Sequence, residues 1–141
     1  MEKKKNDKSE EIGYFSMHFG IYPRKLFIIK GSNKNKVITD NFIGRDGRSN
    51  LIVEDDDTST GSRMWSVRER FTGKWGFLVQ LKRAKSTSEL AHEATHVAFE
   101  LFRDIGGIAD EDNQEPFAYL VGWVTEQLLY AYRYKENKND K

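Results

Sequence analysis

The chain has 141 residues, a length that suits one folded domain. Lysine and arginine (23) nearly balance aspartate and glutamate (22), so the net charge is +1 and no global field draws the protein to nucleic acid or to an anionic membrane. Cysteine is absent, which excludes disulfide bonds and thiolate metal ligands. Any bound metal must therefore be held by histidine, aspartate or glutamate.

Composition predicts one domain over residues 12–134, flanked by polar tails at 1–11 and 135–141 that we expect to be disordered. The first tail is basic but lacks the apolar stretch of a signal peptide, which favours a cytoplasmic protein. Within the domain, residues 12–83 are typical of β structure and 86–134 of two helices.

Alternating apolar residues open the β part of the chain. Phe15, Met17, Phe19 and Ile21 predict a first strand, which Pro23 ends. Residues 26–30 predict a second strand, and 37–43 a strand that returns after a turn at 31–36. A turn at 44–47 and a short apolar run at 51–53 follow.

The clearest β signal is a hairpin with its turn at Thr72-Gly73-Lys74. Trp65, Val67 and Phe71 share one face before the turn. Trp75, Phe77, Val79 and Leu81 share a face after it.

Two helices are predicted after the hairpin. Ser86 and Glu89 form a capping-box pattern, and the helix that begins there ends at Gly106-Gly107, where one glycine can adopt the left-handed cap. Its apolar stripe consists of Leu90, Ala94, Val97, Ala98 and Leu101. A second helix is expected from about 112 or 113 to 134, with Pro116 in its first turn.

The sequence His92-Glu93-Ala94-Thr95-His96 lies on the first of these helices. Four-residue spacing puts both imidazoles on one helix face, so both can reach one ion. Glu93 is rotated to the side, where it can accept a proton from a metal-bound water. The motif therefore predicts a catalytic Zn²⁺ site with His92 and His96 as ligands and Glu93 as general base.

Catalytic zinc usually has three protein ligands. Glu115, in the first turn of the second helix, is the best candidate for the third, because an antiparallel return could bring it near the histidines. Asp104 is its main rival, followed by Asp110 and Asp112. His18 is better explained as a strand residue.

His92, Glu93, His96 and, after eighteen further residues, Glu115 resemble the ligand pattern of the gluzincin metallopeptidases, which include thermolysin-like enzymes and a family of aminopeptidases. The chain also resembles small zincin-like proteins of bacteriophages and their bacterial hosts. The resemblance covers residues 86–132. It implies an α+β zincin-like fold, in which a small twisted antiparallel or mixed sheet packs on the active-site helix and a second C-terminal helix.

The resemblance further implies zinc held by His92, His96 and Glu115, with Glu93 as general base and acid. It implies that the strand at 75–81 is the sheet edge to which a peptide substrate pairs. Tyr119 stands where many gluzincins have an aspartate behind a ligand histidine, so Asp110, Asp112 or Glu126 is expected to supply that contact. Tyr119, Tyr130 or His18 is the expected oxyanion partner, and Tyr119 is taken as the second catalytic residue.

A zinc-dependent hydrolase that acts on peptide or protein is therefore the expected function. The alternative is a phage or bacterial structural or interaction module that keeps the fold without catalysis, its partner being a virion or host protein. A phage-encoded chain is expected in the cytoplasm of the bacterial host, or associated with the virion.

Two other sequence patterns resemble binding sites but are better explained otherwise. Glu54 to Asp57 lacks the ligand spacing of a calcium loop and is expected to be a solvated turn. The basic residues of the hairpin region alternate with aromatic ones, as on some nucleic-acid surfaces. The expectation is instead a wet face whose aromatics pack inward, with no membrane or nucleic-acid partner. The residues concerned are Arg63, Trp65, Arg68, Arg70, Phe71, Lys74, Trp75, Lys82 and Arg83.

Overall fold

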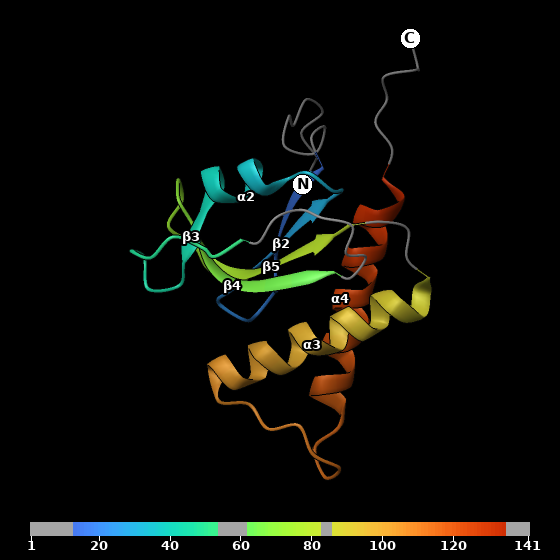
Figure 1. Ribbon diagram of the computed structural model, residues 1–141. Coiled ribbons are helices and arrows are strands. Elements are labelled where there is room, and N and C mark those ends of the chain that lie inside the picture. The colour runs from blue at the N-terminus through green and yellow to red at the C-terminus, as the bar shows by residue number, and fades with distance from the viewer. Residues whose placement is uncertain (1–12, 54–61, 83–85, 135–141) are drawn as a thin grey trace. The chain divides into compact units, whose positions relative to one another are not determined.

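The computed structural model describes residues 13–53, 62–82 and 86–134 (Figure 1). In this part of the chain the fold is α+β, with a five-stranded mixed sheet and three helices. The described residues form two compact units, one up to Lys82 and one from Ser86 to Tyr134. No helix described here is both long and apolar enough to cross a membrane. The two tails and Glu54 to Asp57 lie outside the described residues.

The first unit is built on one sheet with the strand order β1-β2-β5-β4-β3. The strands are β1 (Tyr14–His18), β2 (Lys25–Lys30), β3 (Phe42–Gly44), β4 (Arg63–Glu69) and β5 (Trp75–Leu81). Strand β5 pairs in parallel with β2, whereas the other neighbours are antiparallel. The sheet is therefore mixed, which is one of the two sheet types expected from the sequence.

The expectation that residues 75–81 form a sheet edge is wrong. Strand β5 has β2 on one side and β4 on the other, so its backbone hydrogen bonds are already used. Six of its seven residues are buried, which is typical of a central strand. Among the described residues, the outer strands of this sheet are β1 and β3.

One face of the sheet carries a core to which helix α2 (Asn35–Asn41) contributes Ile38. Edge-to-face contacts join Phe42 to Tyr14 and to Phe27, with ring centroids 5.5 and 5.0 Å apart. Full burial of each large apolar side chain stabilises the fold by about 1.5–3 kcal/mol. The fully or nearly fully buried members of this core are Tyr14, Phe27, Ile29, Ile38, Phe42, Val67 and Leu78.

Helix α2 and β3 replace the single strand expected at 37–43. The β-branched run Val37-Ile38-Thr39 favours a strand, but Ile38 is buried in the core from the helix and Phe42 from the short strand that follows it. The Thr39 hydroxyl donates to the Asn35 carbonyl (3.0 Å), and Lys36 pairs with Asp40 (3.0 Å). Tertiary burial therefore outweighs the local β propensity.

One further strand prediction needs correction, whereas the hairpin is confirmed. Strand β1 ends at His18, and Ile21 is 90% exposed, so the alternation does not continue to it. In the short apolar run at 51–53, Leu51 and Val53 pack against the core without forming a strand. Strands β4 and β5 form the expected hairpin, and Gly73 adopts the positive φ (71°) that its turn needs.

Polar groups are also held inside this unit. The Gln80 side chain, fully buried in β5, accepts hydrogen bonds from Arg63 Nε (3.0 Å) and Nη2 (2.6 Å) and donates to the Gly31 carbonyl (2.8 Å). The Tyr14 hydroxyl donates to the Glu69 carboxylate. Burial raises the pKa of Tyr14 well above its ordinary value, and the hydrogen bond to Glu69 and its charge add to the rise.

The second unit consists of α3 (Thr87–Ile105) and α4 (Glu115–Arg133). The Ser86–Glu89 capping box is present, and Gly106 takes the left-handed cap with φ 78°, so both predicted limits of α3 are confirmed. The predicted stripe is buried, together with Phe102. Phe117 of α4 packs on Phe99 and Phe102 of α3, with ring centroids 4.6 and 5.4 Å apart.

Replacing Gly76 with alanine should destabilise the protein, because the added Cβ would lie 2.0 Å from the Lys25 carbonyl oxygen on β2. Only movement of the strand backbone relieves that overlap, so we expect a loss of roughly 2–3 kcal/mol or more in the free energy of unfolding. Chemical denaturation measures it. Gly122→Ala is the control, since its Cβ meets nothing within 4 Å and alanine favours a helix by about 0.5–1 kcal/mol. A G76A protein as stable as wild type would contradict the close β2–β5 approach.

Candidate metal centre

His92 and His96 meet on the surface of α3. Their Nε2 atoms are 3.2 Å apart and their ring centroids 4.7 Å, with the rings nearly perpendicular (81°). Both residues are exposed, whereas Ala94, Val97 and Ala98 between and after them are buried. The helix thus buries its apolar stripe and leaves the two imidazoles available on another face, as the spacing predicts.

The pair fits the geometry of zinc ligation. Zinc–nitrogen bonds are about 2.0–2.1 Å long, and two nitrogens 3.2 Å apart at that distance subtend an angle of about 100–106° at the ion. The tetrahedral angle is about 109°, so the separation of the two nitrogens suits a tetrahedral ion. Without a metal, the Nε2–H of one ring can donate a hydrogen bond to Nε2 of the other ring.

Glu93 is half-buried beside His92 on the same helix. Successive residues of a helix are rotated by about 100°, so Glu93 does not point along the line of the two imidazoles. Among the described residues, the Glu93 carboxylate makes no hydrogen bond or ion pair, which leaves it available as a proton acceptor. That position agrees with a role as base rather than as ligand.

Glu115 is not brought into a ligand group. It is the first residue of α4 and is exposed. In the described part of the chain no three histidine or acidic side chains gather closely enough to hold a metal ion. Glu115 shares its unit with the histidines, because Phe117, two residues later, contacts α3. The structure therefore assembles two of the three predicted ligands.

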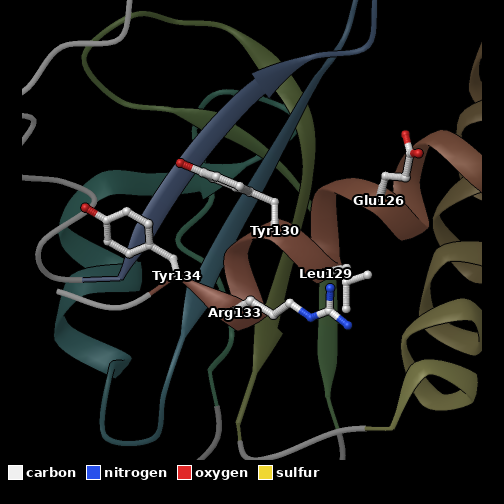
Figure 2. Close-up of a pocket in the computed structure, with 5 residues that line it drawn as sticks. All are labelled: Glu126, Leu129, Tyr130, Arg133 and Tyr134. Carbon is white, nitrogen blue, oxygen red and sulfur yellow. The ribbon is translucent and has the colours of Figure 1, made fainter.

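The expected oxyanion and supporting residues are spread along α4. Tyr119 is 74% exposed and lies one turn after Glu115 on the same face. Tyr130 and Glu126 line a different feature, a pocket of about 480 Å³ on one face of α4 (Figure 2). Leu129, Arg133 and Tyr134 complete its lining, which contains neither histidine.

The rival ligands lie elsewhere. The Asp110 carboxylate accepts a hydrogen bond from the Asp112 amide (3.0 Å) within the loop between α3 and α4. Asp104 lies near the end of α3 and already has a polar or electrostatic interaction. His18 lies at the end of β1 in the other unit, where it lines a second pocket.

One acidic residue on the histidine face, Glu100, was not predicted from the sequence. Glu100 follows His96 by four residues, so it lies on the same side of α3, one turn further on. Its carboxylate is 3.4 Å from Arg103. The repeated four-residue spacing from His92 through His96 is the signal by which it could have been found.

The basic and aromatic residues of the hairpin region differ in burial and in partner. Arg63 is bound to Gln80 and lies over Trp65 (5.2 Å), and Lys82 is buried. Arg68 lies instead over Trp75 (4.8 Å). Trp65 is partly buried against the core, as expected, whereas Phe71 is 82% and Trp75 37% exposed, so these two do not pack inward. Arg83 lies outside the described residues.

Comparison with protein-family models, with curated proteins and with solved structures finds no match to this chain. The resemblance to zincins therefore rests on the sequence pattern over residues 86–132 alone.

Proposed function

We propose that this protein is a zinc-dependent hydrolase, and specifically a small metallopeptidase, with His92 and His96 as metal ligands. The observation that carries the proposal is the 3.2 Å separation of the two Nε2 atoms on a helix that is capped at both ends. Histidine pairs of this spacing with a glutamate after the first histidine are the signature of zinc peptidases. Zinc, when bound, supplies Lewis acidity and lowers the pKa of its bound water to about 7.

Glu93 is the proton carrier in this proposal. Its carboxylate takes a proton from the attacking water as the water oxygen bonds to the substrate carbonyl carbon. It then delivers that proton to the leaving nitrogen as the C–N bond breaks, so one group serves as base and acid. The half-buried position of Glu93 beside His92 and the absence of a competing salt bridge among the described residues support this assignment.

Glu115 remains the proposed third ligand and Tyr119 the proposed oxyanion partner. The spacing between His96 and Glu115 supports Glu115 as a ligand. So does the packing of Phe117, near the start of α4, against α3. Tyr119 follows Glu115 at the four-residue spacing that places both on one helix face. Binding through Glu115 requires its exposed side chain to come closer to the imidazoles than it lies in the described residues.

A non-catalytic structural or interaction module is the second candidate. It is favoured by one observation: the described residues gather two metal ligands rather than three. Such a module would bind its partner with or without metal, and Glu93 would have no chemical task in it.

Zinc binding should depend on both histidines. We expect about one zinc ion per chain by elemental analysis, and His92→Ala or His96→Ala should weaken the affinity by roughly 100-fold or more, about 3 kcal/mol. Glu115→Gln should also weaken it, by at least tenfold, as the loss of a charged ligand. Glu111→Gln is the matched control, because Glu111 is an exposed acid just before α4.

A zinc content near zero in the purified protein would end the proposal. Equal affinities for E115Q and E111Q would instead remove only Glu115 from the ligand set and leave the histidine pair in place.

Glu93→Gln should separate catalysis from metal binding. Loss of a general acid–base typically costs 10²–10⁴-fold in rate, so we expect at least a 100-fold fall in the cleavage of a mixed peptide library with zinc content unchanged. Mass spectrometry of the products measures cleavage, and E111Q should retain the wild-type rate. A wild-type protein that holds zinc but shows no chelator-sensitive cleavage would favour the structural module.

A further inference from the structure

The C-terminal half of α4 has a face that combines charged and apolar side chains (Figure 2). Its residues are spaced by three or four positions, so they lie on one side of the helix, where they line the pocket of about 480 Å³. Glu126, Tyr130 and Arg133 are exposed, whereas Leu129 and Tyr134 are partly buried. The α4 face, as we call these five residues, therefore has an acid at one end, a base toward the other and an apolar centre.

The two charged residues of the α4 face do not neutralise each other. Seven residues of helix extend about 10 Å along the axis, which is too far for Glu126 and Arg133 to pair within one chain. In the part of the chain that the structure describes, neither side chain makes an ion pair with another residue. Both charges are therefore available to a partner of opposite charge.

The order of residues on the α4 face makes it complementary to itself. Glu126 and Arg133 lie equally far along the helix from the midpoint between Leu129 and Tyr130. A two-fold axis through that midpoint would place each Glu126 opposite Arg133 of the second copy, and each Leu129 opposite its Tyr130. Such a contact, in which the same surface is used by both copies, is the usual interface of a two-fold dimer.

The charges also select the direction of the second helix. In a parallel pair with the same residues in register, Glu126 would oppose Glu126 and Arg133 would oppose Arg133, and like charges in contact are unfavourable. In the antiparallel pair both ends carry opposite charges. Charge complementarity thus favours an antiparallel copy of this chain.

We propose that the α4 face is the contact surface of a symmetric antiparallel homodimer, held by two Glu126–Arg133 ion pairs around a centre of Leu129 and Tyr130. Tyrosine and arginine are common among the residues that dominate binding at protein interfaces. The pocket beside Tyr130 provides a concave surface against which the apolar side chains of the second copy pack. The contact is about two helical turns long and smaller than the roughly 1,200 Å² of stable specific interfaces, so the dissociation constant should be on the order of 100 μM.

Dimerisation goes beyond the proposed hydrolase function. None of the five residues of the α4 face is a proposed metal ligand, general base or oxyanion partner. Zinc content and self-association are measured separately, so either proposal can fail while the other stands.

Sedimentation equilibrium of the full-length protein at low ionic strength, at concentrations up to about 1 mM, tests the proposal. A chelator in the buffer prevents metal ions from bridging the exposed histidines of two chains. Glu126→Arg and Arg133→Glu should each raise the dissociation constant at least tenfold, because like charges then face each other at both ends of the contact. Added salt should also weaken the wild-type dimer, since its ion pairs are close to solvent.

The double variant E126R/R133E should restore the wild-type dissociation constant, because it exchanges the two charges and keeps them opposite. An equimolar mixture of the two single variants should associate as strongly as wild type for the same reason. Both results exclude misfolding as the cause of the single-variant defects. Glu111→Arg is the matched control, since it reverses an exposed charge outside the α4 face and should leave the dissociation constant unchanged.

Three results would overturn the proposal. The wild-type protein would remain monomeric up to about 1 mM. Alternatively, it would dimerise with a dissociation constant that neither single reversal changes, which would place the contact on another surface. The third is a double variant that associates as weakly as the single variants.

Discussion

Strand β5 must be hydrogen-bonded along both edges, and the rest of the sheet depends on this condition. Residues Gly76 to Leu81 pair in parallel with β2 on one side, and β4 covers the other. The approach is close enough at Gly76 that a side chain would overlap the backbone of Lys25. Gln80, near the far end of the strand, is buried but satisfied by Arg63 and Gly31, so its polarity costs little.

The same strand creates an aromatic and cationic surface. Trp75 is its first residue and pairs in register with Arg68, which places a guanidinium beside the indole. Because β2 runs parallel to β5, the segment leading into β2 reaches the same end of the sheet and adds Arg24 and Lys25. The backbone pairing that stabilises the core thus also gathers the positive charge.

Features with local signals were predicted well from the sequence. The limits of α3 follow from Ser86, Glu89 and Gly106, whose roles involve only residues within a few positions, and the face shared by His92 and His96 follows from helix geometry alone. Helix α2 was missed because its formation depends on packing Ile38 and Phe42 against Tyr14 and Phe27, which are distant in sequence.

Non-local pairing explains the other errors. Whether residues 75–81 lie at an edge depends on β2, some fifty residues earlier. The sequence of the strand itself does not indicate a parallel partner. The arginines around Trp75 come from positions 24, 45 and 68, and no spacing rule along the chain connects them. The position of Glu115 likewise depends on the loop between α3 and α4 rather than on a count of residues.

The imidazoles of α3 are separated by one helical turn, and this has a consequence for folding order. A single ion bound to both would cross-link two residues four positions apart. Their imidazoles lie close together in the helix but far apart in the extended chain. Together with the capping box at Ser86 and the glycine cap at Gly106, such a link would lower the free energy needed to nucleate α3, using only residues of the helix and its caps. Metal uptake would then become a reporter of when this helix forms, independent of the sheet that precedes it in the chain.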